Sequence, residues 1–367
     1  MIDIALLREH PEIVKGSQKK RGLSTEHVER AIKLDKEWRD LKHEVDSILS
    51  GRNKISQEIN LAKKHGKDIS RLLRNARQIP LLLEKKEKLM GEKKVQRDML
   101  LLEIPNIVDA TVPVGEKASN EILKTFGKPK KFSFNIKDHA DILESLGILD
   151  TKKAGEVAGS RFYYLKGDLV KLNQAIINYA LDFLSKKKFI LMQPPFMLRR
   201  NILSGALPIG AFQEMIYKIE DEDLYLIGTA EHAINAYYAN EQIESSKLPL
   251  RFAGISSCFR KEAGSHGKDT KGIFRVHQFE KIEQFIFCRP GDSWKEFDLI
   301  LKNSEEMLKS LKIPFRFVVL ASQEMGRVST KTVDFECWFP SHGAYRELGS
   351  CSNCLDYQAR RSNIKFQ

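Results

Sequence analysis

One segment of the chain concentrates side chains that could bind a charged ligand. Residues 258–283 read CFRKEAGSHGKDTKGIFRVHQFEKIE, a pattern that predicts two strands joined by a Gly-rich, cationic loop. Because successive side chains of a strand point to opposite faces, one face of the second strand carries Arg275, His277, Phe279, Lys281 and Glu283. Arg260 and Glu262 share one face of the first strand. Burying several unpaired charges is costly, so we expect this face to meet a charged ligand.

The loop between the strands favours this hypothesis over a plainer one. A solvated sheet face with internal ion pairs would show the same alternation. The loop, residues 263–272, contains three glycines and two lysines, so its backbone N–H and ammonium groups could close over a polyanion. The planar fork of an arginine suits phosphate or carboxylate, and Phe279 offers a flat surface on which a base could stack.

The elements around this hairpin predict two domains, because 367 residues exceed one ordinary core. Residues 105–132 hold three prolines and two glycines and predict a linker between residues 1–104 and residues 133–367. In the C-terminal part, helices are predicted at 169–188 and 293–311, and strands at 223–227, 250–259, 315–320 and 332–339. This order lacks the βαβ alternation of a doubly wound fold. We therefore predict an α+β fold with an antiparallel sheet flanked by helices.

The N-terminal part predicts two long helices. Apolar residues recur at a 3-4 spacing from Trp38 to Ile59, which is typical of a coiled-coil seam. The pattern breaks around Gly66, and a second helical run follows over residues 69–102. Two long helices joined by a short polar turn make an antiparallel hairpin. Pro80 lies inside the second run, where it should kink or interrupt the helix.

Four motifs in this order and spacing resemble class II aminoacyl-tRNA synthetases, in their seryl version. FRKE, a loop and FRVHQFEKIE resemble motif 2, and MQPPF at residues 192–196 resembles motif 1, which implies a homodimer interface there. GTAEH at residues 228–232 resembles the serine-binding loop. YRELGSCSNCLDYQARR at residues 345–361 resembles the stretch that holds ATP and Mg²⁺. The resemblance implies an enzyme of protein biosynthesis that activates L-serine with ATP to seryl-adenylate and transfers it to tRNA(Ser), and it leaves tRNA(Sec) open as a second acceptor.

The basic residues are concentrated near the tip of the helical hairpin. The chain has 61 Lys and Arg against 49 Asp and Glu, a net charge of +12. Residues 52–78 alone carry eight basic residues, with Glu58 and Asp68 as their acids. A solvated, salt-bridged surface and a phosphate-binding arm fit this composition equally well. The resemblance favours the arm, which implies tRNA contacts at Arg52, Lys54, Lys63, Lys64, Arg71, Arg74 and Arg77.

The resemblance also assigns roles around the hairpin. Serine activation joins a carboxylate to the α-phosphate of ATP, and this step depends on positioning and on positive charge. Arg260 and Glu347 are implied as catalytic residues, with Mg²⁺ held through ATP by Glu347 and Ser350. The implied ATP-binding residues are Arg260, Lys261, Glu262, Arg275, Val276, Phe279, Lys281, Glu347, Leu348, Gly349 and Ser350.

A serine pocket needs a carboxylate for the ammonium and a polar partner for the hydroxyl. By the same resemblance, the pocket consists of Thr229, Ala230, Glu231, Arg260 and Glu283. Taken alone, Thr229 and Glu231 could simply cap a helix that begins near His232. Beside the intact hairpin motif, we favour the binding interpretation.

The cysteines and the hydropathy indicate the compartment. An odd number of cysteines, five, without framework spacing fits a reducing cytosol. Cys351 and Cys354 form a lone CxxC with Cys337 and His342 upstream, which leaves a zinc site open. Without a second CxxC, we expect these cysteines to pack in the protein interior. No apolar run approaches the length of a membrane span, and the N-terminus is unlike a signal peptide, so we expect a cytoplasmic protein.

The chain departs from the family at its end, ARRSNIKFQ. Motif 3, with its arginine for the distal phosphates, has no counterpart, so we expect a fragment with weak or absent serine activation. Two alternatives come from other classes: a non-catalytic, synthetase-like paralogue that binds tRNA or regulates, and an amino-acid ligase that loads a carrier protein. Retention of Glu231, Arg260 and Glu347 argues against the first. The basic arm counts against the second.

Overall fold

The long N-terminal helices and the mixed C-terminal part belong to different compact units. The computed structural model describes residues 1–207, 215–263 and 272–367. One unit comprises Ile2–Lys19 and Leu23–Pro105, and the other comprises Met1, Lys20–Gly22 and Asn106–Gln367. Within the described residues, no helix is long and apolar enough to cross a membrane.

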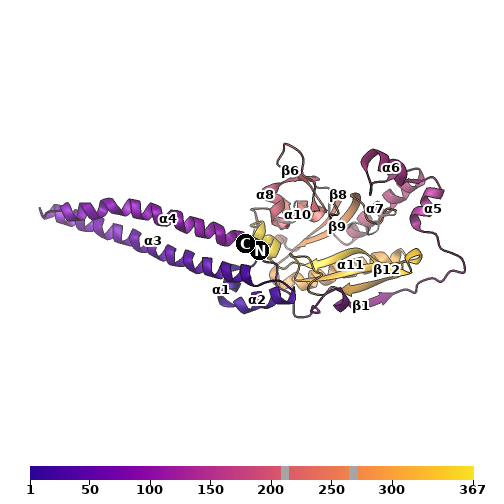
Figure 1. Ribbon diagram of the computed structural model, residues 1–367, viewed down its shortest axis with the longest axis horizontal. Helices are drawn as coiled ribbons and strands as arrows, with labels where there is room; N and C mark the ends of the chain where they lie inside the picture. Colours follow the sequence, from indigo (N-terminus) through magenta and orange to yellow (C-terminus); the bar gives the residue numbers. More distant parts are fainter. Residues whose placement is uncertain (208–214, 264–271) are drawn as a thin grey trace. The chain divides into compact units, whose positions relative to one another are not determined.

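Two long helices dominate the first unit. α3 (Glu26–Lys64) and α4 (Ser70–Glu103) run antiparallel and side by side, and α1 (Ile4–Glu9) and α2 (Pro11–Lys20) precede them (Figure 1). Gly66 lies in the turn between α3 and α4 with φ +63°, a left-handed conformation that favours glycine. The predicted helical hairpin is confirmed.

α4 continues through Pro80 without interruption, so the expected break does not occur. Proline lacks the N–H that would bond the carbonyl four residues earlier. Pro80 lies on the exposed side of the helix, where water can hydrogen-bond the carbonyl of Ala76 instead. The lost helical hydrogen bond is therefore tolerated at this position.

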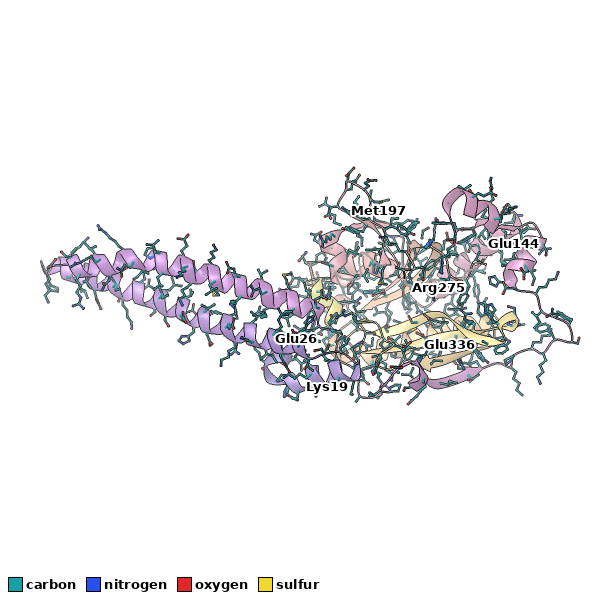
Figure 2. The ribbon with its side chains drawn as sticks, in the orientation of Figure 1. Lys19, Glu26, Glu144, Met197, Arg275 and Glu336 are labelled. Atoms are coloured by element: carbon teal, nitrogen blue, oxygen red, sulfur yellow. The ribbon has the colours of Figure 1, made fainter. Side chains whose placement is uncertain are left out.

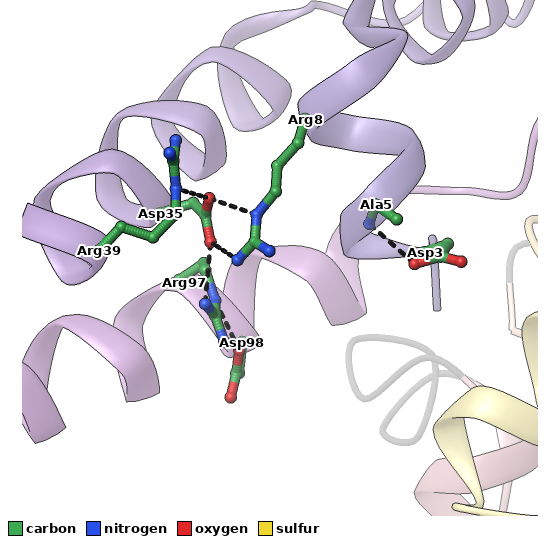
Figure 3. A network of polar contacts seen from close by, with 7 residues as sticks. All are labelled: Asp3, Ala5, Arg8, Asp35, Arg39, Arg97 and Asp98. Carbon is green, nitrogen blue, oxygen red and sulfur yellow. Dashed lines mark hydrogen bonds and ion pairs between the residues drawn. The ribbon is translucent and has the colours of Figure 1, made fainter. Parts of the chain in front are cut away.

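A buried carboxylate ties the base of the arm together (Figure 3). The side chain of Asp35 is only 2% exposed. It accepts hydrogen bonds from Arg8 at 2.8 Å, from Arg39 at 3.0 Å and from Arg97 at 2.9 Å. Burial alone would raise the pKa of Asp35, but the hydrogen bonds from Arg8 and Arg39 outweigh burial and lower it. Asp35 thus links α1, α3 and α4 as an anion.

A four-stranded antiparallel sheet with the order β1-β10-β11-β12 forms the lower layer of the second unit (Figure 1). Its strands are β1 (Glu121–Phe126), β10 (Phe315–Val319), β11 (Lys331–Phe339) and β12 (Ala344–Asn353). One face packs against the amphipathic helix α11 (Ser293–Ser310). Phe297 and Leu308 of α11 meet Phe315, Phe317 and Val333 of the sheet in a buried core.

The position of β1 corrects the predicted linker. Residues 121–126 fall within 105–132, yet they pair with β10 as an edge strand. Ile122 and Leu123 are each 57% exposed. An edge strand held mainly by backbone hydrogen bonds needs no alternating apolar pattern, so its sequence gives little warning. Val108 and Val112 of the same segment are buried beside Met325.

A three-stranded sheet carries the polar hairpin. β4 (Ile190–Met192) pairs in parallel with β8 (Leu250–Phe259), and β8 pairs antiparallel with β9 (Gln278–Phe287). α10 (Ala230–Tyr237) packs against Phe252, and α7 (Asp168–Lys186) packs against Ala253 on the opposite face. A Cβ at Gly254 would lie 2.6 Å from the Ile234 side chain, so this glycine allows α10 to approach the sheet closely.

The hairpin strands are shorter than the alternation predicts. β8 ends at Phe259 and β9 begins at Gln278, so Arg260, Glu262 and Arg275 lie beyond the strands. The two arms stay in contact there, because the Arg260 N–H donates to the His277 carbonyl at 2.9 Å. Except for residue 263 at its start and Gly272 at its end, the cationic loop lies outside the described residues.

Short elements complete the second unit. β5 pairs with β6, β2 with β3, and β7 in parallel with β13. Among the described residues, the further strands are β2 (Leu149–Asp150), β3 (Tyr164–Leu165), β5 (Met197–Arg199), β6 (Leu224–Leu226), β7 (Gln242–Ile243) and β13 (Lys365–Phe366). The further α-helices in this part of the chain are α5 (His139–Ser145), α6 (Thr151–Ala158), α8 (Arg200–Ala206) and α12 (Tyr357–Arg361).

Candidate active site

Thr229 connects the start of α10 to the polar hairpin. Its hydroxyl accepts the N–H of Glu231 at 3.4 Å, so Thr229 is the N-cap of α10. The same hydroxyl donates to the Glu283 carboxylate on β9 at 2.6 Å. The capping interpretation is therefore correct, and it places Thr229 beside the hairpin at the same time. Ala230, the first residue of α10, is fully buried against Phe252.

Four charged side chains converge between α10 and β9. Lys281 forms an ion pair with Glu283 and donates to the Thr229 hydroxyl at 3.4 Å. Burial raises the pKa of Glu231, and the negative charge of Glu283 raises it further. Burial alone would lower the pKa of Lys281, but Glu283 outweighs burial and raises it. Arg260 adds positive charge to the same group.

Arg260 is held by the backbone of the segment at residues 228–232. Its Nε donates to the Gly228 carbonyl at 3.1 Å, and its guanidinium lies 5.2 Å from the centre of the Phe279 ring. His232 holds the other side of Gly228, because its Nδ1 accepts the Gly228 N–H at 3.3 Å. Burial lowers the pKa of His232 to about 3, with Arg260 and Lys281 contributing. A neutral imidazole and a cation thus hold the two backbone polar groups of Gly228.

The predicted adenine and phosphate residues lie where the hairpin leaves its strands. Glu262, at φ +50°, forms an ion pair with Arg275 at 2.5 Å (Figure 2 labels Arg275). The Val276 side chain is buried. The Lys261 ammonium lies 5.9 Å from the centre of the Tyr217 ring, and the Lys261 N–H donates to the Met215 carbonyl at 3.0 Å.

The predicted metal-binding stretch forms most of β12. Glu347 lies opposite Glu336 of β11, and Ser350 lies opposite Asp334. Glu347, Leu348 and Ser350 are exposed. Gly349 packs under a ring, since a Cβ there would lie 2.3 Å from Phe335. These carboxylate and hydroxyl oxygens are ligands that Mg²⁺ accepts, and cross-strand neighbours of an antiparallel pair lie on one face.

Asp334 is a candidate that the sequence analysis missed. It is 7% exposed, and burial followed by the charges of Glu347 and Glu336 raises its pKa to about 8. Strict alternation along TVDFECW does place Asp334 and Glu336 on one face, so the signal was present in the sequence. A nearby cation would favour the ionised form of Asp334, which fits a metal at Glu347 and Ser350.

A cavity of about 500 Å³ lies between the charged cluster of α10 and β9 and the predicted metal-binding stretch of β12. Its wall includes residues 281–288 of β9 and its end, and residues 348–355 of β12 and its end. Because these are unbroken runs rather than alternate residues, the cavity lies along strand edges. It brings Glu231, Lys281 and Glu283 together with Leu348, Gly349 and Ser350.

Three of the five cysteines are buried, and Cys288 and Cys354 are half-buried. Cys351 packs in the core formed by the four-stranded sheet and α11, and burial raises its pKa to about 12. Burial also raises the pKa of Cys354. The five cysteines are free. Among the residues that the structure describes, no group of three or more His, Cys, Asp or Glu side chains could hold a metal ion.

The predicted tRNA contacts lie on both helices of the arm. Figure 2 shows side chains projecting outward along α3 and α4. The seven basic residues share an exposed position: Arg52, Lys54, Lys63, Lys64, Arg71, Arg74 and Arg77. This arrangement leaves their charges accessible to a polyanion.

Family models match both ends of the chain. The model described as the seryl-tRNA synthetase N-terminal domain matches residues 1–108. The model described as the class II tRNA synthetase core domain (G, H, P, S and T) matches residues 217–367. Serine–tRNA ligases of Nitrosopumilus maritimus and Helianthus annuus are each 45% identical over 100% of this chain, which covers 87% and 85% of those relatives.

Two solved structures that are similar to this chain are also seryl-tRNA synthetases. The seryl-tRNA synthetase of Pyrococcus horikoshii complexed with ATP has a TM-score of 0.97 and 42% identity, and the match covers 100% of this chain and 87% of the other. The cytoplasmic serine–tRNA ligase of Naegleria fowleri in complex with AMP has a TM-score of 0.92 and 36% identity, covering 100% of this chain and 88% of the other.

Proposed function

The chain belongs to the serine–tRNA ligases, which are class II aminoacyl-tRNA synthetases, and we propose that the cluster of Glu231, Glu283 and Thr229 is its serine-binding site. The observation that carries this proposal is the hydroxyl-to-carboxylate pair of Thr229 and Glu283 next to the half-buried Glu231. Because the chain belongs to this family, we favour serine–tRNA ligation over the two alternatives, a non-catalytic paralogue and a carrier-protein ligase.

The cluster matches the two polar groups of free serine that adenylation leaves unchanged. The Glu231 carboxylate pairs with the α-ammonium, and Glu283 and Thr229 hydrogen-bond the side-chain hydroxyl. Arg260, which lies beside this cluster, binds the serine carboxylate. A site built around a hydroxyl rejects alanine, since its buried polar groups would lose a partner. Ala230 forms the apolar floor of the proposed serine pocket.

The enzyme uses ATP, and we place the nucleotide along the exit of the hairpin. Arg260 bridges the serine carboxylate and the α-phosphate, where it stabilises the charge that develops in the transition state. Glu262 and the backbone of Val276 bind the adenine amino group, and Phe279 stacks on the ring. Arg275 exchanges its ion pair with Glu262 for the distal phosphates, while Lys261 and Lys281 add positive charge.

Glu347 and Ser350 are the proposed Mg²⁺ ligands, with the backbone of Leu348 and Gly349 beside them. The metal would supply positive charge that neutralises the phosphates. What supports this assignment is the oxygen-only set of donors on one face and the buried carboxylate of Asp334 beneath it. Asp334 would then be stabilised in its ionised form.

Residues 1–104 are the proposed tRNA-binding arm, and residues 133–367 together with β1 are the proposed catalytic domain. We propose tRNA(Ser) as the substrate, and tRNA(Sec) as a second one. The exposed basic residues of α3 and α4 bind phosphates of the tRNA backbone, which requires positive charge but no base contact.

We further propose a cytoplasmic homodimer. Apolar side chains of α7 and β4 are exposed to an extent unusual for a monomer: Leu172 54%, Ile176 48%, Ile190 50% and Leu191 46%. Several exposed large apolar side chains on neighbouring elements favour an interaction site there. A relative from Arabidopsis thaliana, 44% identical, is named as cytoplasmic, and the free cysteines fit a reducing compartment.

The serine site is tested by replacing its ammonium partner. Glu231→Gln should weaken binding of a seryl-adenylate analogue, 5′-O-(N-seryl)sulfamoyladenosine, by about 10- to 100-fold, because a charge-assisted hydrogen bond is lost. Isothermal titration calorimetry measures this, and serine-dependent pyrophosphate exchange reports the same loss in turnover. Glu241→Gln, at an exposed position after α10, is the control. Unchanged affinity in Glu231→Gln would refute the assignment.

A further inference from the structure

Gln358 of α12 reaches the proposed ammonium partner from a distant part of the chain. Its Nε2 donates to the Glu231 Oε1 at 2.6 Å across 127 residues of sequence. Gln358 is 6% exposed. Within the described part of the chain, this is the one hydrogen bond recorded for the Glu231 carboxylate. A buried amide is therefore committed to a half-buried carboxylate.

The position of α12 is fixed independently of Glu231. Arg361 donates to the carbonyls of Ser204 at 2.7 Å and Leu207 at 3.0 Å. The N-terminal amine of Met1 donates to the Tyr357 carbonyl. Tyr357 is itself 1% exposed. Because both ends of this short helix are tied down, the amide of Gln358 is presented to Glu231 in a defined place.

We propose that Gln358 is a positioning residue for serine binding, because its amide holds the Glu231 carboxylate in place and in its charged form. This inference rests on the proposed role of Glu231. It adds a residue from α12 that acts through its hydrogen bond to Glu231.

The charges around Glu231 explain why such a donor matters. Glu283 and Lys281 face it from β9, Arg260 from the end of β8, and Cys354 from the segment before α12. Burial and Glu283 raise the pKa of Glu231, whereas the hydrogen bond from Gln358, Lys281 and Arg260 lower it. Without the amide, the pKa of Glu231 rises further. A smaller fraction of Glu231 is then ionised at a given pH, and the deficit relative to wild type grows as the pH decreases toward 6.

The experiment uses two ligands that differ only in the ammonium group. 5′-O-(N-Seryl)sulfamoyladenosine and its desamino analogue are titrated calorimetrically into wild type, Gln358→Met and Arg360→Met from pH 6 to pH 8. Methionine keeps the length of glutamine but cannot donate. Arg360→Met introduces the same residue at an exposed position of α12. The affinity of each variant is divided by the affinity of wild type at the same pH, so the protonation of the ligand amine, which is common to both, cancels.

We expect Gln358→Met to weaken binding of the seryl ligand by about 10-fold at neutral pH, more at pH 6 and less at pH 8. The desamino ligand and the Arg360→Met variant should show no change. Equal losses for both ligands, a loss independent of pH, or no loss would overturn the role of Gln358. Failure of the serine site itself is distinguishable, since Glu231→Gln would then bind the seryl ligand normally.

Discussion

The hydroxyl of Thr229 donates to the carboxylate of Glu283 at 2.6 Å, which joins the cap of α10 to the middle of β9. The two residues are 54 positions apart in sequence. One hydroxyl thus completes a helix end through the Glu231 N–H and orients a carboxylate in the proposed serine site. The cap of α10 and the proposed recognition of serine share the same oxygen atom.

Thr229→Val should therefore lower discrimination between serine and alanine. Valine keeps the shape but leaves Glu283 without its hydroxyl partner, which costs about 1–3 kcal/mol. We expect the affinity for the seryl analogue to fall toward that for the alanyl analogue in calorimetric titrations. Thr229→Ser, which keeps the hydroxyl, should preserve the preference. A preserved preference in Thr229→Val would contradict a role for this hydroxyl.

Asp334 should make stability depend on pH. Its pKa is about 8 in the folded protein against 3.8 ordinarily, so the folded state binds more protons between these values. The free energy of unfolding should fall as the pH rises from about 4 to about 8, by up to about 1.4 kcal/mol per pH unit. Urea titrations of Asp334→Asn at pH 6 and pH 8 should show a smaller decrease than wild type.

Glu336→Gln is the matched control for that measurement. Glu336 lies on the same face but already accepts a hydrogen bond from Arg316 at 2.5 Å. Glu336→Gln removes one of the charges that raise the pKa of Asp334, so it should flatten the decrease less than Asp334→Asn does. An equal flattening in both variants would mean that Asp334 is not the titrating group.

Asp35→Ala should destabilise the base of the arm. Arg8, Arg39 and Arg97 would lose a common acceptor, and removing one partner of a buried ion pair costs about 3–5 kcal/mol. The melting of the helical arm, followed by circular dichroism, should occur at a lower temperature. Asp98→Ala removes only the exposed partner of Arg97 and should have a much smaller effect. Equal effects would argue against the buried position as the cause.

Reversal of charge at the arm should weaken tRNA binding. Replacement of Arg71, Arg74 and Arg77 by Glu should reduce the affinity for tRNA(Ser) and lower the slope of log affinity against log salt by roughly one per lost phosphate contact. Filter binding at several salt concentrations measures both. Reversal of the exposed Lys128, Lys130 and Lys131 changes the net charge equally and should leave the slope closer to wild type. Identical slopes in both triple variants would contradict a specific arm.

Local patterns were sufficient for much of the fold. The 3-4 spacing predicted the helical hairpin, and alternation predicted both strands of the polar hairpin, although β8 ends before Arg260 and β9 begins after Arg275. Alternation also placed Lys281 and Glu283 on one face, where they form an ion pair. These features depend on neighbours within a few residues, so the sequence carries them directly. The edge strand β1 was missed because its pairing with β10 leaves no periodic signal.

The contacts that make the site were settled by packing between distant segments. Nothing in YRELGSCSNCLDYQARR indicates that Gln358 meets Glu231, and the burial of Asp334 follows from its place among β10, β11 and β12. The types and faces of the site residues are encoded along the chain, because a strand or helix fixes them locally. The assembled fold decides which carboxylate is buried and which donor reaches a carboxylate, since burial and a 2.6 Å contact both require the partner segment.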